Sequence, residues 1–394
     1  MMTSQATLAM DDFQTKAFRT DQNKRDGMEG LRFPLLGLFG EAGSLLSALK
    51  KKQRDRAAYI GYRESVIEEF GDVLWYFSNI ARRANLKLSE LAGKLPSDET
   101  HWSKGGVHVF VSFSDLQPLV GGGGTAAESA YEQRLIELGG KVGRLLDDVA
   151  LGRIERNRDA LTGHLVEILR AVVSAADDAG VSLEEVAHHN LEKTKSRWPQ
   201  PDERVPPPLF DEDEDPEERL PRRIEMNIME RGLDGRRYVR MQWNGVNIGD
   251  RLTDNKTEPD DYRFHDVFHM ACAAILGWSP VTRALLKVKR KSNPTVDENQ
   301  DGARAQLVEE SISTWIFAHA LALDYFRSID TIDYPLLKAI EAQVRGYEVE
   351  RCPLWLWEKA ILDGYRAFRC LREQRKGIVI ADLLSRSIQF RPIA

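Results

Sequence analysis

The segments LLGLFGEAGSLLSALKKK (residues 35–52) and ESVIEEFGDVLWYFSNIARR (residues 64–83) decide the fold of the N-terminal part of this chain. In both, apolar residues recur at intervals of three and four, which predicts two amphipathic helices that pack through their apolar faces. Glu41 borders the apolar face of the first helix, and Glu69 and Asp72 lie within the second. Because Glu69 and Asp72 are three residues apart, they are neighbours on one helix face.

These three carboxylates predict a divalent metal site. A carboxylate in apolar surroundings must be protonated, paired with a cation or bound to a metal ion. No Arg lies between the acids within either apolar run, so we expect Mg²⁺, a hard ion that prefers oxygen ligands, with Mn²⁺ as its substitute. The alternative is that Glu41 and Glu69 border the core and form surface ion pairs.

Three motifs resemble the MazG-like all-α nucleoside triphosphate pyrophosphohydrolases: GEAGS (residues 40–44), EEFGDVLWYF (residues 68–77) and NLKLSELA (residues 85–92). In that family one helix carries E-x-x-E and a later helix carries E-x-x-D. The four carboxylates bind Mg²⁺ against the substrate triphosphate. The resemblance covers about residues 10–198 and implies an all-α bundle with hydrolase activity.

The same resemblance implies roles for individual acids. Glu41, Glu69 and Asp72 match the family's metal ligands. Ser44 stands where the family has its second Glu, which removes one negative charge from the site, and a neutral hydroxyl is a weak ligand. Glu68 is the candidate fourth carboxylate or general base, so we assign Glu68 and Glu69 as the candidate catalytic pair.

Neighbouring cations and aromatic residues are candidate substrate contacts. Cations after the first helix could pair with the outer phosphates, and rings beside the acids could stack on the base. Long cations at a helix end are also favoured by the helix dipole without any ligand, so that alternative stays open. The candidate substrate-binding residues are Lys50, Lys51, Lys52, Arg54, Trp75 and Tyr76.

Residues 131–198 repeat the pattern of residues 31–92. The second copy keeps the apolar spacing but loses most acids, which indicates that it is kept for packing, since a four-helix core needs two helix pairs. We infer an intramolecular pseudo-dimer. The tail HHNLEKTKSRWP (residues 188–199) resembles the N-x-x-K-x-x-R ending of family members. In the second copy Lys141 replaces Glu41, Arg144 replaces Ser44, His164 replaces Glu69, and Glu167 stands at the position of Asp72.

Two roles remain open for the cations of the second copy. Lys141 and Arg144 could approach the substrate phosphates, or they could lie on a solvated face.

The C-terminal part, residues 223–394, is a different module that resembles no family known to us. RRIEMNIMERG (residues 222–232) and RRYVRMQWNGVNIGDRL (residues 236–252) are typical of strands, with WNGV as a turn signal. Helical patterns follow in DDYRFHDVFHMACAAILGW (residues 260–278) and RAQLVEESISTWIFAHAL (residues 304–321). We therefore expect a mostly helical α+β domain.

This module carries a second polar cluster. His265 and His269 are four residues apart on one helix face, and two imidazoles at this spacing can share a metal ion. Asp266 follows His265, and the second helix adds Glu309 and Glu310, with His319 further along. These residues predict either a second divalent metal site or a hydrogen-bonded network completed by Arg263 and Arg304.

The expected organisation is a mainly α chain with an N-terminal helical bundle and a separate C-terminal domain. Between the two repeats, Val107, Val109 and Val111 could form a short strand, and residues 121–124 are a run of glycines. The predicted divisions are residues 1–95 (first repeat with the active site), 96–130 (insertion and Gly-rich joint), 131–198 (second repeat), 199–222 (Pro-rich acidic linker) and 223–394 (C-terminal α+β domain).

Composition argues against a membrane-spanning, secreted or nucleic-acid-binding protein. Apolar residues make up 42% of the chain and charged residues 29%, and no apolar run reaches the roughly 20 residues that span a bilayer. The start of the chain lacks the pattern of a secretory signal, so we expect a cytoplasmic protein. Three widely spaced cysteines predict buried thiols, and a net charge of −6 argues against nucleic-acid binding.

The resemblance and the acids together predict a Mg²⁺-dependent nucleoside triphosphate pyrophosphohydrolase that converts (d)NTP to (d)NMP and pyrophosphate. The alternative is a nucleotide-binding sensor or scaffold with weak or no turnover, whose C-terminal domain is the effector. The expected partner is the triphosphate substrate, with no membrane, and a homodimer stays open because one chain could already supply both helix pairs.

Overall fold

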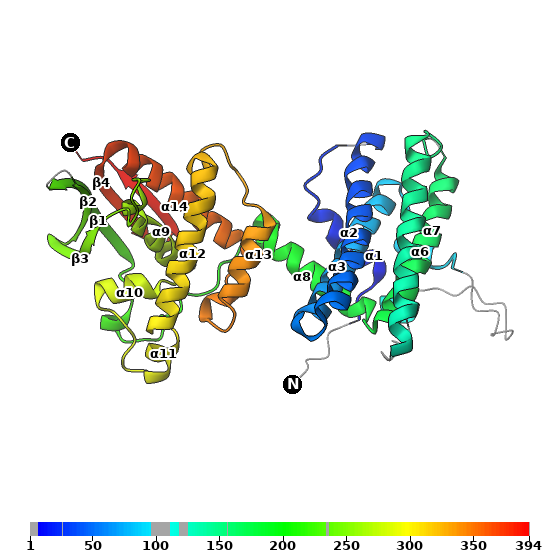
Figure 1. Ribbon diagram of the computed structural model, residues 1–394, viewed down its shortest axis with the longest axis horizontal. Helices are drawn as coiled ribbons and strands as arrows, with labels where there is room; N and C mark the ends of the chain where they lie inside the picture. The colour runs from blue at the N-terminus through cyan, green and yellow to red at the C-terminus, as the bar shows by residue number, and fades with distance from the viewer. Residues whose placement is uncertain are drawn as a thin grey trace. The chain divides into compact units, whose positions relative to one another are not determined.

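The computed structural model divides the chain into two compact units, Met1–Pro201 and Asp202–Ala394 (Figure 1). Each unit is described by itself. The residues that the structure describes are 7–25, 27–95, 111–117, 125–155, 157–233 and 236–393.

Among the described residues of the N-terminal unit, the regular elements are helices, apart from an isolated β-bridge between Ala9 and Ser112. Two long helix pairs, α2 with α3 and α6 with α7, run side by side, and α2 also packs against α6 (Figure 1). Their apolar faces, together with α1, α4 and α8, form one core. The elements are α1 (Met10–Arg19), α2 (Gly27–Asp55), η1 (Arg56–Ala58), α3 (Tyr62–Arg83), α4 (Leu88–Ala92), α5 (Phe113–Leu116), α6 (Thr125–Ala150), α7 (Arg158–Ala179), α8 (Leu183–Arg197) and η2 (Pro201–Glu203).

The two helix pairs end in the same way. After α3 the chain turns at Asn85, whose φ is 55°, and after α7 it turns at Gly180, whose φ is 67°. Left-handed backbone is accessible to Asn and Gly, so both residues suit a helix end. Each turn is followed by a buried apolar residue, Leu86 or Val181, before the next helix. The geometry thus parallels the repeat in the sequence, although the MazG-like character of both copies stays a prediction.

The C-terminal unit combines a small antiparallel sheet with helices. Its strands lie in the order β3-β2-β1-β4-β5, and α9 and α14 pack against β4 and β5. The elements are η3 (Pro216–Glu218), β1 (Arg223–Leu233), β2 (Arg236–Trp243), β3 (Val246–Leu252), η4 (Tyr262–Phe264), α9 (Asp266–Ala271), the π-helix η5 (Cys272–Leu276), α10 (Pro280–Leu286), α11 (Pro294–Asn299), α12 (Ala303–Ala322), η6 (Asp324–Phe326), α13 (Tyr334–Gln343), η7 (Glu348–Arg351), α14 (Leu354–Gln374), β4 (Lys376–Asp382) and β5 (Ser387–Arg391). The expected mainly α chain with a mostly helical α+β C-terminal domain is confirmed.

The sheet begins where the sequence indicates strands. β2 and β3 are joined at Asn244 and Gly245, whose φ values of 49° and 80° suit a tight hairpin turn. Inward-facing residues alternate along β1, where Ile224, Met226 and Ile228 are buried. Strands β4 and β5 were not expected from the sequence. They make β1 the central strand of the sheet, hydrogen-bonded to β2 along one side and to β4 along the other.

The helix expected over residues 260–278 is wrong as one continuous element. The structure has a 3₁₀ turn, the short helix α9 and a π-helix there. Asp261 explains the late start: its φ is 69°, and its carboxylate accepts hydrogen bonds from Arg263, Arg372 and Arg375. This arrangement holds a left-handed backbone that cannot begin a right-handed helix.

Helix α9 is buried against α14 at a point of close approach. A Cβ atom added to Gly364 on α14 would lie 2.8 Å from the Ala271 side chain of α9. Glycine therefore lets the two helices come together and fixes the position of α9.

Part of the predicted linker, residues 199–222, is folded into the C-terminal unit. Leu209 and Leu220 are buried in its core. The Asp211 carboxylate accepts hydrogen bonds from Arg222 and Arg283, so an acid that composition suggests is solvated is instead paired inside. The expectation of an uncovered linker is thus wrong for this part.

Two other sequence features lie outside the described residues, namely Val107 and Val109 of the predicted short strand and the glycines at 121–124. Val111 is described and is not part of a strand. Within the part of the chain that the structure describes, no helix combines the length and apolar character needed to cross a bilayer. Cys272 and Cys352 are buried thiols, whereas Cys370 is half-buried.

Gly37 and Gly40 on α2 offer a matched test of helix packing. A Cβ atom at Gly37 would lie 2.2 Å from the Tyr76 ring, whereas one at Gly40 would meet nothing within 4 Å. We expect Gly37→Ala to lower the free energy of unfolding by about 1–3 kcal/mol through overpacking. Gly40→Ala should raise it by up to about 1 kcal/mol because alanine favours a helix. Urea unfolding of both variants measures this, and equal effects would contradict the packing of Tyr76 on α2.

Candidate active site

Three carboxylates converge between α2 and α3. Glu41 from α2 and Glu69 and Asp72 from α3 each offer one oxygen atom, and these atoms all lie within 4.8 Å of one another. All three residues are half-buried. Glu69 and Asp72 share a helix face, as their spacing predicts, and the packing of α2 on α3 adds Glu41.

Helix α8 holds one of these acids in place. Asn190 Nδ2 donates to Asp72 Oδ1 at 3.0 Å, and Lys193 Nζ donates to Asp72 Oδ2 at 2.5 Å and to Glu68 Oε1 at 3.2 Å. The close approach needs Gly71, because a Cβ atom there would lie 3.0 Å from Asn190 Cβ. Asn190 and Lys193 were not among the predicted site residues. Their N-x-x-K spacing in the tail was the signal that could have identified them.

The cluster is short of positive charge. Burial, together with the hydrogen bond and negative charge of Glu41, raises the pKa of Glu69 to about 8. Burial likewise raises the pKa of Asp72 to about 6, although Lys193 opposes this rise. Groups that resist ionisation for lack of a counter-charge gain most from a bound cation.

These residues fit a hard divalent ion. The converging donors are carboxylate oxygens alone, which Mg²⁺ prefers, and their mutual repulsion is the kind that a divalent cation relieves. Glu41, Glu69 and Asp72 are the residues that could hold it. Ser44 lies one turn after Glu41 on α2 and is also half-buried. Glu68 lies at the edge of the cluster, where Lys193 pairs with it.

One of the two predicted aromatic contacts lies beside the cluster. The Tyr76 ring packs on Gly37, one turn before Glu41, and stands edge-on to Phe33, a residue that is 52% exposed. Burial raises the pKa of Tyr76 to about 12, with Glu41 and Asp72 adding to the rise. Trp75 is different. It is 8% exposed, and its Nε1 donates to Thr20 Oγ1 at 3.0 Å, so it is a core residue.

The predicted phosphate-binding cations are not brought to the acids. Lys50 is nine residues beyond Glu41 on α2, a rise of about 14 Å along the helix. Lys52 Nζ donates to the Arg56 carbonyl and lies over the Tyr62 ring, and Arg54 pairs with Asp55. Lys50 and Lys51 are exposed. These contacts match the alternative of cations at a helix end, although binding of phosphate by them stays untested.

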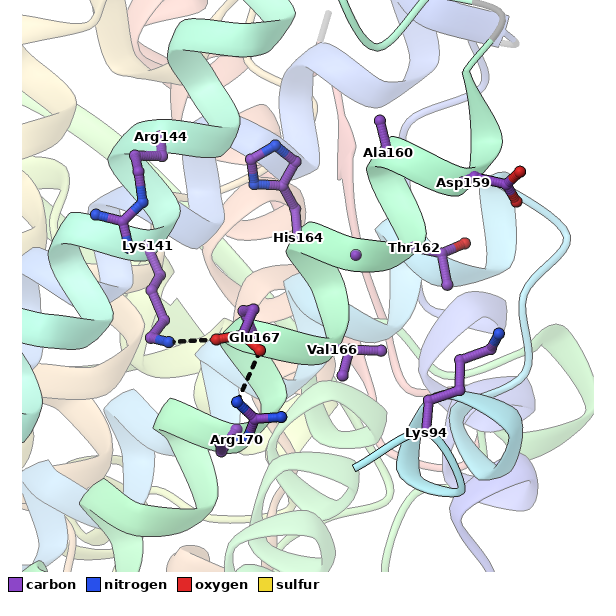
Figure 2. Close-up of a pocket in the computed structure, with 11 residues that line it drawn as sticks. Lys94, Lys141, Arg144, Asp159, Ala160, Thr162, His164, Val166, Glu167 and Arg170 are labelled. Carbon is purple, nitrogen blue, oxygen red and sulfur yellow. Dashed lines mark hydrogen bonds and ion pairs between the residues drawn. The ribbon is translucent and has the colours of Figure 1, made fainter. Parts of the chain in front are cut away.

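The second helix pair bears a pocket of about 840 Å³ with a different character (Figure 2). Lys141 Nζ lies 2.7 Å from a Glu167 oxygen, and Arg170 reaches the other oxygen of Glu167 at 2.7 Å (Figure 2). Glu137 also pairs with Lys141. Lys141 and Glu167 are the positions that the alignment matches to Glu41 and Asp72. The second copy thus places an ion pair where the first copy places two acids.

The predicted second cluster is also brought together. His265, His269 and Glu310 each offer one ligand atom, and these atoms lie within 4.8 Å of one another. Glu309 contacts His269 and Asp266 contacts His265. His319 is engaged elsewhere, since its Nδ1 lies 3.0 Å from the Trp315 carbonyl oxygen. Arg263 binds Glu230, Asp254 and Asp261 instead of this cluster.

Comparison with known proteins finds a similarity for the C-terminal half. Residues 205–394 match the MazG C-terminal domain, so the half for which the sequence analysis named no family is similar to MazG proteins. A stretch of 66 residues is 38% identical to the Gene 37 protein of Mycobacterium phage L5. That stretch is 16% of this chain and spans 58% of the phage protein. No solved structure matches the chain. The MazG-like repeats of the N-terminal half remain a prediction.

Glu69→Gln tests whether the acids are held together against their repulsion. Gln cannot ionise, so the variant avoids the cost of keeping this crowded carboxyl group protonated, and the metal-free protein should be more stable by about 1 kcal/mol, as replacement of functional residues often makes it. The substitution should also abolish the rise in melting temperature that Mg²⁺ gives the wild type. Thermal unfolding with and without Mg²⁺ measures both effects. Glu64→Gln, at an exposed position of α3, is the control and should keep the Mg²⁺ response. An unchanged Mg²⁺ response in Glu69→Gln would argue against this site.

Proposed function

We propose that the N-terminal unit is a Mg²⁺-dependent nucleoside triphosphate pyrophosphohydrolase that releases a nucleoside monophosphate and pyrophosphate. The observation that carries the proposal is the convergence of Glu41, Glu69 and Asp72 within 4.8 Å on two packed helices. The MazG-type C-terminal half supports a hydrolase of this family.

In this proposal the three acids hold the ion. When bound, Mg²⁺ neutralises phosphate oxygens and lowers the pKa of an attacking water molecule. Asn190 and Lys193 act on the acids themselves: they bind both oxygens of Asp72 and so fix its orientation. Such positioning from outside the ligand set matters because a metal site needs rigid ligands.

Other residues of the chain have proposed roles around this centre. Glu68, bound by Lys193 at the edge of the cluster, offers a carboxylate that can accept the proton of the attacking water. Tyr76 and Phe33 offer aromatic surface one to two turns before Glu41, where a nucleobase could stack. Trp75 has no part in this proposal because it is buried.

A second candidate function is binding without turnover. Two observations favour it: Ser44 replaces an expected carboxylate, and Lys193 already neutralises part of the charge of Asp72. A site with fewer available negative charges holds its metal less tightly. In this case the N-terminal unit senses a nucleotide and the C-terminal domain is the effector.

The decisive experiment identifies the product. Full-length protein with Mg²⁺ should release pyrophosphate, and no orthophosphate, from at least one member of a panel of canonical and damaged triphosphates. Asp72→Asn should lower the rate about a hundredfold or more, since metal ligation contributes several kcal/mol to such reactions. Lys141→Met, in the second copy, is the matched control and should keep most of the activity. Orthophosphate as the sole product would refute the proposed reaction.

Ser44→Glu separates the enzyme from the sensor. The added carboxylate, one turn from Glu41, should tighten Mg²⁺ binding severalfold because it adds a charged ligand. If wild type binds a triphosphate that stays intact, the sensor function holds, and hydrolysis gained by Ser44→Glu would locate the defect. Isothermal titration for Mg²⁺ and chromatography of the nucleotide measure the two properties. Wild-type turnover at ordinary enzyme rates of about 1 per second or more excludes the sensor.

A further inference from the structure

The C-terminal unit holds a second constellation of ligand-type side chains, on α9 and α12. His265 and His269 lie one turn apart, and Glu310 faces them from α12. His265 Nε2 lies 3.9 Å and His269 Nε2 3.4 Å from the same atom, Glu310 Oε2. Two nitrogen atoms and one oxygen atom therefore converge on one point.

The opposite edge of each imidazole is fixed by an acceptor. His265 Nδ1 lies 2.9 Å from the Tyr262 carbonyl oxygen, and His269 Nδ1 lies 2.9 Å from Glu309 Oε1. A carbonyl oxygen can only accept, so Nδ1 of His265 carries a proton, and Nε2, which faces Asp266 and Glu310, is the nitrogen that a metal ion could bind. A ring nitrogen bound to a carbonyl or carboxylate in this way is the usual support of a metal-binding histidine.

Glu309 is built to support His269. Besides His269, its carboxylate accepts from Ser279 Oγ at 2.7 Å and from the Val281 backbone N–H at 2.9 Å. These donors hold an ionised acceptor behind the imidazole, within a fully buried site. The orientation of the His269 ring on α9 is therefore fixed by Glu309 on α12, which is itself held by residues at the start of α10.

One buried atom of this constellation forms no hydrogen bond with the residues that the structure describes. His269 is 1% exposed, and its Nε2 forms no hydrogen bond with any described residue, although Glu310 Oε2 lies at ion-pair distance, 3.4 Å away. A buried polar nitrogen without a partner is costly. It points toward Glu310 and His265, at the place where a bound ion would satisfy it.

The carboxylates of this cluster also favour binding of a cation. Asp266, Glu309 and Glu310 are the acids of the cluster, and none of the Lys and Arg side chains in the described ranges forms an ion pair with them. Arg263, which the sequence analysis considered as a partner, is saturated by Glu230, Asp254 and Asp261. Three carboxylates face two imidazoles in this cluster, and a divalent ion bound among them would balance the negative charge of the carboxylates.

Donor type and spacing select the ion. Two imidazole nitrogens with one carboxylate suit Zn²⁺, in contrast to the oxygen-only cluster of the N-terminal unit. Ligands of a tetrahedral Zn²⁺ at about 2.0–2.1 Å lie about 3.4 Å apart. The observed separations of 3.4 Å and 3.9 Å therefore leave room for Zn²⁺ with small side-chain adjustments.

We propose that His265, His269 and Glu310 form a Zn²⁺ site with one coordination position left for water or an oxygen ligand. Three protein ligands are typical of reactive rather than structural zinc sites. The Glu310 side chain is 41% exposed, so the site opens to solvent on this side. Asp266, 3.1 Å from His265 Nε2, is placed to bind that water, and Tyr262 stacks on the His265 ring at 4.2 Å.

The test uses the full-length protein, stripped with a chelator and then loaded with Zn²⁺ in the presence of millimolar Mg²⁺, which occupies oxygen-only sites. We expect one equivalent of Zn²⁺ per chain after gel filtration, measured by elemental analysis. Glu310→Gln, at a half-exposed position, should weaken binding about tenfold or more, and His269→Ala should abolish it. His319→Ala, on the same helix as Glu310 but outside the cluster, should bind as wild type does.

A spectroscopic readout covers the case in which His269→Ala fails to fold. Co²⁺ bound to wild type should show the visible absorption of a four-coordinate site, and Glu310→Gln, checked by circular dichroism, should weaken or shift it. Less than a tenth of an equivalent of Zn²⁺ in wild type would overturn the proposal. So would Zn²⁺ binding that neither Glu310→Gln nor His269→Ala alters, or retention of Mn²⁺ or Fe²⁺ to the exclusion of Zn²⁺.

Discussion

Negative charge that is partly removed from water must be balanced, and this constraint shapes both units of the chain. In the N-terminal unit Glu41, Glu69 and Asp72 crowd together, and Lys193 from α8 supplies only part of the compensation. Helix α8 is thereby tied to the helix pair that carries the acids. In the C-terminal unit buried carboxylates are satisfied by arginines, as around Asp211, Asp261 and Asp301. The Glu309 carboxylate differs from these because it pairs with a histidine, His269, and not with an arginine.

The two helix pairs of the N-terminal unit pack in the same way but carry different polar residues at matching positions. Both pairs have a buried apolar face and a left-handed turn at the end of the second helix. In the second pair, however, Lys141 and Glu167 neutralise each other. A self-satisfied ion pair has little need of a ligand, whereas crowded acids do. The apolar spacing is therefore required for the bundle, and the acids of the first pair are not.

Spacing along one helix predicted which site residues share a face, whereas partners from other helices depend on long-range packing. Residues three or four apart on one helix share a face, which is why Glu69 with Asp72, and His265 with His269, could be paired from the sequence. Partners from another helix, such as Lys193 or the facing Glu310, depend on how helices pack, which spacing does not report. The burial of Trp75 could not be predicted, because an aromatic ring beside acids on a helix can lie in a core or line a pocket equally well. The late start of α9 depends on three arginines, two of them over a hundred residues away.

Strand β1 has a consequence for the order in which the polypeptide becomes structured during synthesis. Its hydrogen bonds on one edge go to β2, which follows at once, but those on the other edge go to β4, whose partner residues lie more than a hundred positions later, as in Ile224 with Ala381. Until residues 376–391 leave the ribosome, that edge is an unpaired template for other strands. The helical unit has its main contacts nearer in sequence and can fold earlier. Nascent chains halted before residue 376 are therefore the species in greatest need of a chaperone.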